Sequence, residues 1–132
     1  MSMTDPISDF LARIRNAIIG RKVMVTVPAS NLKVKLAEIM KSEGYIRAFD
    51  LKKDDRQGVL EVELKYDREN KCAIEGMQRI SRPGQRRYAK AAEVPQVRNG
   101  LGIAVMTTSQ GLMTDREARK RTLGGEVICA IW

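Results

Sequence analysis

The segment that most constrains the fold of this chain is its last third, residues 99–132. An apolar run at 101–106 predicts a strand, and the polar residues 107–111 that follow it predict a turn. Thr114 and Glu117 have the spacing of a capping box, so a short helix is expected to begin between them. A strand, a polar turn and a capped helix in this order predict a compact β-rich unit.

The expected helix is basic and leads into a final strand. Its positive side chains are Arg116, Arg119, Lys120 and Arg121. The pair Gly124-Gly125 is expected to stop the helix, and residues 126–132 predict the last strand. The complete arrangement is typical of a surface that holds a ligand.

The first half of the chain alternates helical and extended patterns. Apolar side chains recur at helical spacing over residues 7–18 and again over 32–40. Residues 22–28, 45–53 and 59–66 show the alternation of strands. This order predicts an N-terminal α-β-α-β-β unit in which two helices accompany a three-stranded sheet.

Residues 67–71 form a charged stretch without apolar side chains, and the composition changes across it. We place a domain boundary there. The expected fold class is α+β in two small domains, an N-terminal α/β domain (1–68) and a β-rich C-terminal domain (69–132) with one short helix. The second domain is expected to open with a strand at 72–81, a turn at 82–84 and a short strand at 85–89.

The charge of the chain favours a polyanionic partner. Lys and Arg number 24 against 16 Asp and Glu, which gives a net charge of +8 and an isoelectric point near 9.8. Residues 1–70 hold 13 basic and 11 acidic side chains, whereas 71–132 hold 11 and 5. Nucleic acid fits this excess better than a membrane, because no long basic amphipathic helix carries apolar anchors. The alternative is a charged surface that is merely solvated.

Several classes of function are excluded by what the sequence lacks. There is no histidine, so the commonest general base and metal ligand is missing. Cys72 and Cys129 do not have the spacing of a zinc site and are expected to be reduced, buried thiols. No apolar run approaches the roughly 20 residues needed to cross a bilayer. We therefore expect a cytoplasmic, non-enzymatic protein with no catalytic residue, no metal and no cofactor.

Three features offer contacts to RNA, each with a structural alternative. Tyr88 lies among arginines and can stack on an unpaired base, although packing within a sheet explains it equally well. The hydroxyls of residues 107–109 suit an RNA groove, although they can also cap their own turn. Glu126 can accept hydrogen bonds from bases or from backbone amides. The basic residues that can attract phosphate near Tyr88 are Arg79, Arg82, Arg86, Arg87, Lys90 and Arg98.

Three stretches carry a family likeness: Asp-Pro-Ile-Ser-Asp-Phe-Leu-Ala-Arg-Ile-Arg-Asn-Ala at 5–17, Arg-Pro-Gly-Gln-Arg-Arg-Tyr at 82–88, and the run 100–119 with Gly-Gly-Glu-Val-Ile-Cys at 124–129. Together they resemble bacterial small-subunit ribosomal protein eight over essentially the whole chain. The resemblance implies an RNA-binding protein that contacts the central domain of small-subunit ribosomal RNA early in assembly and helps organise the platform. In some bacteria it also implies repression of the protein's own operon through a similar RNA fold in the messenger.

The resemblance also implies the RNA-binding residues. The family's motifs fall on Thr107, Thr108 and Ser109, on Gly124, Gly125 and Glu126, and on Pro83, Gly84, Arg86 and Tyr88. Their neighbours complete the candidate set: Gln110, Gly111, Arg79, Arg82 and Arg87.

The chain departs from the family's usual pattern at three of these positions. Thr107 replaces a common serine but keeps a hydroxyl. Gln110 replaces a common lysine and so removes a possible phosphate contact, and Arg87 replaces a frequent apolar residue and can restore the charge.

The expected partners are small-subunit ribosomal RNA, neighbouring small-subunit proteins and, in some bacteria, the messenger of the chain's own operon. No membrane is expected, and the free protein is expected to be a monomer. The alternative function is a basic protein-protein scaffold that docks acidic partners and makes contact through its N-terminal helices.

Overall fold

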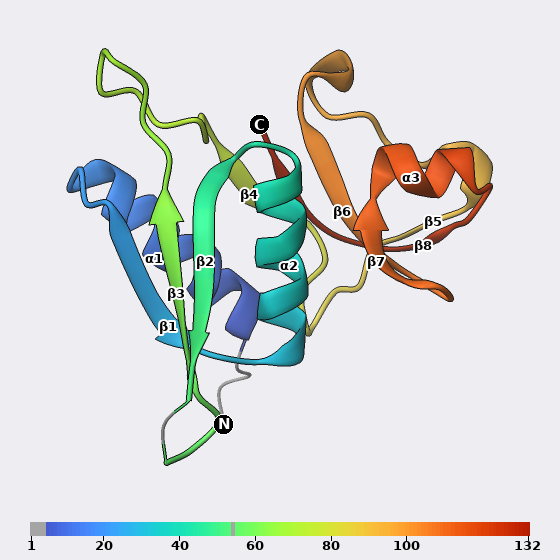
Figure 1. Cartoon of the computed structure of the whole chain (residues 1–132). Helices are drawn as coiled ribbons and strands as arrows, with labels where there is room; N and C mark the ends of the chain where they lie inside the picture. The colour runs from blue at the N-terminus through green and yellow to red at the C-terminus, as the bar shows by residue number, and fades with distance from the viewer. Residues whose placement is uncertain (1–4, 54) are drawn as a thin grey trace. The chain divides into compact units, whose positions relative to one another are not determined.

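The computed structural model of the chain describes residues 5–53 and 55–132 (Figure 1). They fall into two units. One is Ile7–Ile74, and the other is Glu75–Trp132 with the described end of the segment Met1–Pro6. Mixed helices and strands in both units confirm the expected α+β class. The exact domain ranges 1–68 and 69–132 stay a prediction. No helix in the described part of the chain is long and apolar enough to cross a membrane.

The first unit is built on an antiparallel sheet in which, among the described residues, three strands follow the order β1-β3-β2. Its elements are α1 (Pro6–Ile19), β1 (Met24–Pro28), α2 (Asn31–Ser42), β2 (Ile46–Lys52) and β3 (Val59–Leu64). Side chains along β1 alternate between exposed and buried, and those along β3 alternate between partly and fully buried. One face of the sheet is therefore covered. The expected α-β-α-β-β order is confirmed.

Local signals explain where the two helices begin and end. Pro6 opens α1 at a position where its missing N–H costs no hydrogen bond. Ser30 caps α2, because its Oγ accepts a hydrogen bond from the N–H of Lys33 at 3.2 Å. Gly44 follows α2 with a φ of +83°, a left-handed conformation that glycine adopts at little cost.

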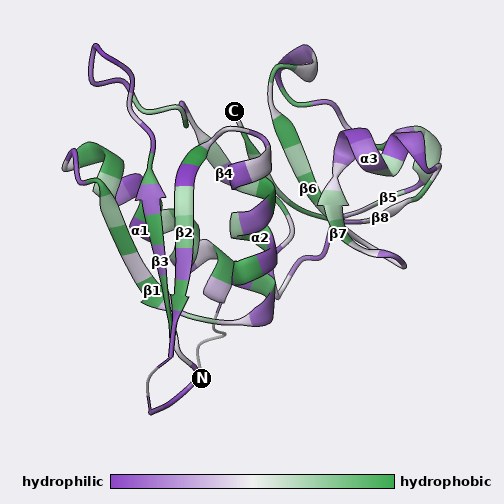
Figure 2. Cartoon of the chain, viewed as in Figure 1, coloured by the Kyte–Doolittle hydropathy of each residue, from purple (hydrophilic) through white to green (hydrophobic). Residues whose placement is uncertain are grey.

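The second unit is an antiparallel sheet that carries the short α-helix α3 and two single-turn 3-10 helices, η1 and η2. Its elements are β4 (Met77–Arg79), β5 (Tyr88–Ala89), η1 (Ala91–Glu93), η2 (Arg98–Gly100), β6 (Ile103–Thr108), β7 (Gly111–Thr114), α3 (Asp115–Lys120) and β8 (Gly125–Ile131). The strand order among the described residues is β4-β8-β6-β7, and β5 also pairs with β8. Most of β6 and β8 is buried. Figure 2 shows the contrast between the hydrophobic strand β6 and the hydrophilic helix α3.

The strand expected at residues 72–81 is much shorter than predicted, because only β4 forms. Cys72 makes a single bridge to Tyr66 in the first unit, so the chain changes units inside the predicted strand. Gly76 then lies under the side chain of Trp132, where an added Cβ would stand 2.4 Å from the ring. Gly76 and Trp132 also exchange two backbone hydrogen bonds of 3.0 Å, so backbone pairing and close packing of the indole together fix this part of the chain.

The turn expected at residues 107–111 is also shorter than predicted. β6 continues through Thr108, and β7 begins at Gly111, so only Ser109 and Gln110 connect the two strands. The sequence did not indicate β7, which has four residues and, within the described part of the chain, pairs only with β6. The hydroxyl segment consequently lies at the end of a hairpin with a two-residue connection.

The pair Gly124-Gly125 does not stop the preceding helix, which ends at Lys120. Thr122 takes the left-handed conformation after it, with a φ of 55°. A Cβ at Gly124 would lie 2.5 Å from the carbonyl oxygen of Ala89, and one at Gly125 would lie 2.1 Å from that of Thr107. The two glycines are therefore required because backbones approach closely on both sides of β8.

Candidate nucleic-acid interface

The sheet of the second unit brings the three predicted motifs into one row. On β8, Glu126 lies opposite Tyr88 of β5 on one side and opposite Thr107 of β6 on the other. The neighbouring residue Gly125 lies opposite Thr108. Segments that are far apart in the sequence thus occupy adjacent strands, and we call this group of residues on β5, β8 and β6 the sheet row.

The hydroxyl segment divides into a structural residue and two exposed ones. Thr108 Oγ1 donates to the carbonyl of Gly111 at 2.9 Å and accepts from the N–H of Gln110 at 3.1 Å. The interpretation as a self-capped turn is therefore confirmed for Thr108. Thr107 and Ser109 are exposed, and neither hydroxyl is used in that turn. Their donors and acceptors can reach a ligand.

The neutral side chain of Gln110 holds the positively charged Arg121 at the end of the hairpin. Its Oε1 accepts from Nη1 of Arg121 at 3.0 Å, and Nε of the same arginine donates to Glu117 at 2.7 Å. One half of the expected capping box is confirmed, because the backbone N–H of Glu117 donates to Oγ1 of Thr114 at 3.2 Å, whereas the Glu117 carboxylate is held by Arg121. Sequence reasoning did not place Arg121 in the site, because the contact joins residues from different elements.

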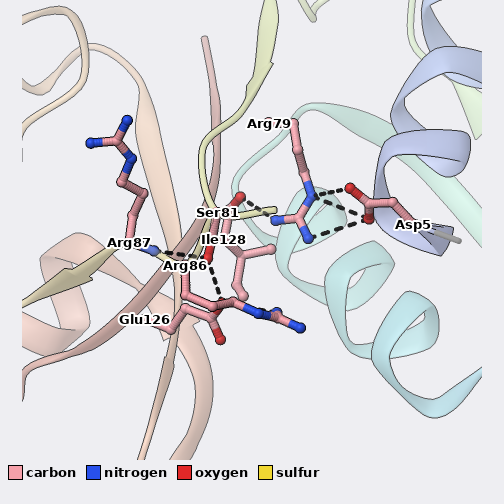
Figure 3. A network of polar contacts seen from close by, with 7 residues as sticks. All are labelled: Asp5, Arg79, Ser81, Arg86, Arg87, Glu126 and Ile128. Carbon is pink, nitrogen blue, oxygen red and sulfur yellow. Dashed lines mark hydrogen bonds and ion pairs between the residues drawn. The ribbon is translucent and has the colours of Figure 1, made fainter. Parts of the chain in front are cut away.

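Glu126 is held in a polar network within the second unit, shown in Figure 3. The fully buried hydroxyl of Ser81 donates to Oε2 of Glu126 and accepts from the N–H of Arg87 at 3.0 Å. Arg86 donates to the same Oε2 at 3.1 Å. Ser81 lies 45 positions from Glu126 in the sequence, so no local signal identifies it.

This network keeps Glu126 ionised. Burial alone would raise the pKa of Glu126, but hydrogen bonds from Ser81 and Arg86 lower it below its ordinary value, and the charges of Arg86 and Arg79 act in the same direction. The side chain is 16% exposed, so part of the carboxylate edge can be reached from solvent. Glu126 is therefore an anion inside a basic surface, and it is already bound by an arginine.

Arg79 belongs to the interior of the second unit. Its side chain is only 9% exposed, its Nε lies 3.1 Å from Oδ2 of Asp5, and its Nη1 donates to the carbonyl of Ile128 at 2.6 Å (Figure 3). The sequence suggested a phosphate contact at this position. The geometry instead gives Arg79 the structural role of holding Asp5 and β8.

The other residues predicted upstream lie at the surface. Arg82 and Gln85 exchange two backbone hydrogen bonds, of 3.0 and 2.9 Å, around the tight turn of Pro83-Gly84. Arg82 and Arg87 are exposed, and in Figure 3 the guanidinium of Arg87 points away from the network. Tyr88 is 73% exposed, so packing within the sheet does not explain its aromatic ring.

The arginines of α3 make contacts within the second unit. Arg116 donates to the carbonyl of Gly100 at 3.1 Å, and Arg119 donates to that of Pro95 at 3.1 Å. Arg119 also pairs with the buried carboxylate of Asp115. Both guanidinium groups therefore stabilise the loop that precedes β6 through hydrogen bonds to its backbone carbonyls.

The described residues hold no group of three acidic, cysteine or histidine side chains that could bind a metal ion. Cys72 and Cys129 are both free thiols. Burial raises the pKa of Cys129 to about 12, so this thiol stays protonated.

Comparison with known proteins gives a consistent result over the whole chain. The family model described as Ribosomal protein S8 matches residues 5–132. The small ribosomal subunit protein uS8 of Staphylococcus carnosus is 55% identical over 132 residues, which is 100% of both chains. The proteins of that name from Leuconostoc mesenteroides subsp. mesenteroides and Staphylococcus epidermidis are 55% and 54% identical, again over 100% of both chains.

Proposed function

The chain belongs to the ribosomal protein S8 family and is thus a non-enzymatic structural constituent of the small ribosomal subunit; from this premise we propose that it binds the central domain of small-subunit ribosomal RNA directly and helps assemble the platform. The observation that best supports RNA binding is the sheet row, in which Tyr88, Glu126 and Thr107 lie on adjacent strands. Exposed arginines lie beside it on the same unit.

Two kinds of contact are proposed at this surface, one for affinity and one for specificity. Arg82, Arg86 and Arg87 attract phosphate, which contributes a salt-dependent and sequence-independent part of the affinity. The exposed hydroxyls of Thr107 and Ser109 hydrogen-bond to 2′-hydroxyls or base edges and so distinguish the shape of the cognate RNA.

Tyr88 and Glu126 complete the proposed recognition. The exposed ring of Tyr88 is available to stack on an unpaired base. Glu126 keeps Arg86 beside the sheet row, and its accessible edge can accept a hydrogen bond from an RNA donor. An RNA phosphate that displaced this carboxylate would not gain the full attraction of Arg86, so the ion pair limits what Arg86 contributes to the affinity for any RNA.

The discriminating experiment compares Ser109→Ala with Ser42→Ala, a change at an exposed serine in the first unit. Dissociation constants are measured for protein-free central-domain RNA and for a random duplex, with transfer RNA as competitor. Loss of one hydrogen bond of about 1 kcal/mol weakens cognate binding roughly fivefold. We expect this loss only for Ser109→Ala and only with the cognate RNA.

Equal losses on both RNAs would show that the hairpin end is not a specificity element. A wild-type chain that does not prefer the central-domain RNA would instead favour the basic scaffold for acidic proteins. The same surface would also bind the messenger of the chain's own operon wherever that messenger reproduces the ribosomal RNA fold. Competition between the two RNAs for the purified chain tests this extension.

A further inference from the structure

The segment that joins η2 to β6 presents an apolar side chain to solvent. Leu101 follows η2 directly and is 85% exposed, more than any other large apolar side chain among the described residues. Figure 1 shows this part of the chain as the loop that extends beyond the start of β6. We call residues 98–101 the Leu101 turn.

The backbone of the Leu101 turn is strained. Arg98, Asn99 and Gly100 are all left-handed, with φ angles of 51°, 54° and 89°. This conformation is sterically unfavourable for an arginine, and strain of this kind is characteristic of segments that bind or switch. Leu101 itself has an ordinary helical conformation, with φ at −80°. Its side chain can therefore be replaced without altering the strain.

Several contacts hold the turn in one arrangement. The guanidinium of Arg98 stacks over the ring of Trp132, 4.6 Å from its centroid. Arg116 donates to the carbonyl of Gly100 at 3.1 Å. Gly102 donates its N–H to the carbonyl of Val97 at 3.0 Å, and a Cβ there would lie 2.7 Å from the carbonyl oxygen of Ile131. The exposed leucine is therefore carried on a preorganised support, which lowers the entropic cost of binding.

We propose that the Leu101 turn docks another protein of the small ribosomal subunit, one that offers an apolar socket bordered by acidic side chains. A leucine side chain has no hydrogen-bonding group and no flat ring, so it can neither pair with base edges nor stack on bases. Burial in an apolar socket is the contact that it favours. Arg98 belongs to the turn and Arg116 is bonded to the carbonyl of Gly100, next to Leu101 in the chain, so the turn carries a positive charge to which carboxylates are complementary.

This surface is separate from the proposed RNA contacts in its chemistry. The sheet row offers hydroxyls and an aromatic ring with arginines beside it, whereas the Leu101 turn offers one aliphatic side chain on a preorganised support. It also differs from the scaffold surface expected on the N-terminal helices. The inference rests on family membership and on the turn itself, and it does not depend on which RNA the chain binds.

A photo-crosslinking experiment tests the proposal in assembled subunits. The full-length chain with p-benzoylphenylalanine at position 101 is incorporated into small ribosomal subunits and irradiated. We expect a crosslink to one ribosomal protein. The same probe at Ile19, which is 75% exposed on the first unit, controls for random proximity. A crosslink from position 101 to RNA, or no crosslink at all, overturns the proposal.

Variants give an independent measurement. Leu101→Asp should lower retention of the chain in subunits by about tenfold, because a carboxylate cannot enter an apolar socket lined by like charge. Leu101→Met should retain wild-type incorporation. Both should melt like the wild type, since the side chain is exposed, and both should bind isolated ribosomal RNA with unchanged affinity. Equal loss of RNA affinity and subunit retention in Leu101→Asp would mean that the turn contacts RNA, which contradicts the proposal.

Discussion

Replacing the buried hydroxyl of Ser81 should weaken the second unit and loosen the segment before β5 that carries the proposed phosphate contacts. Ser81 is fully buried and bridges two elements, because it donates to Glu126 on β8 and accepts from the N–H of Arg87. Ser81→Ala removes both contacts at once. The carboxylate of Glu126 keeps Arg86, and the carbonyl of Arg87 still accepts from the N–H of Val127 on β8, but the N–H of Arg87 loses its partner.

The expected cost follows from these two contacts. A hydrogen bond to a charged group contributes about 1.5–3 kcal/mol, and leaving a buried donor unpaired costs about 1–3 kcal/mol. The Arg87 N–H is only partly buried, so water can recover some of the second contribution. We expect Ser81→Ala to lower the free energy of unfolding by about 2–3 kcal/mol.

The assay is urea unfolding followed by fluorescence, which is selective because Trp132 is the only tryptophan and lies in the second unit. Ser109→Ala is the control, since its exposed hydroxyl should contribute less than about 0.5 kcal/mol. A loss of less than about 0.5 kcal/mol for Ser81→Ala would refute the structural role of the network.

The same pair of proteins should respond to pH in a defined direction. The pKa of Glu126 is lowered from 4.5 in the folded chain, so its ionisation contributes stability that is present above pH 4.5 and is lost as pH falls through the folded pKa. The difference in unfolding free energy between the wild type and Ser81→Ala should therefore be constant near neutral pH and narrow in acid. A difference that widens in acid would contradict the lowered pKa of Glu126 in the folded chain.

Three further predictions concern the sheet row and its surroundings. Arg86→Ala should reduce the salt slope of RNA binding by about one and weaken cognate and random RNA alike, so an unchanged slope would argue against phosphate contact. Gly125→Ala should destabilise the second unit by more than about 3 kcal/mol in the urea assay, because its methyl would overlap the carbonyl facing it on β6, whereas Gly84→Ala has open space and should be nearly neutral. Gln110→Lys removes the acceptor of Arg121 and adds a positive charge, so it should raise the affinity for any RNA and increase the salt slope of binding. Titrations at several salt concentrations measure this slope, and a smaller slope than that of the wild type would contradict a phosphate contact at position 110.

Local signals were sufficient for most of the first unit. The proline of Asp5-Pro6, the capping serine Ser30 and Gly44 mark helix ends through their own backbone chemistry, and β1 and β3 follow the period of two. These features depend on neighbours within a few residues. A single sequence therefore predicts them well.

The second unit was harder to predict because its stability comes from distant pairings. β5 and β7 have only two and four residues and owe their extended form to β8 and β6. Gly124-Gly125 suggested a helix stop, whereas its role is steric and depends on carbonyls from two other strands. Ser81 has no local pattern at all. The predicted RNA motifs lie in one sheet, but their supporting residues could be found only from the structure.

The position of β8 in the sheet has a consequence for the timing of synthesis. β8 pairs with β4, β5 and β6, and all three precede it in the sequence. During translation these strands leave the ribosome without the strand that joins them. The sheet row, which needs Glu126 between Tyr88 and Thr107, can form only after β8 has emerged. An unfinished copy of this chain should therefore be unable to occupy the RNA site of a complete one.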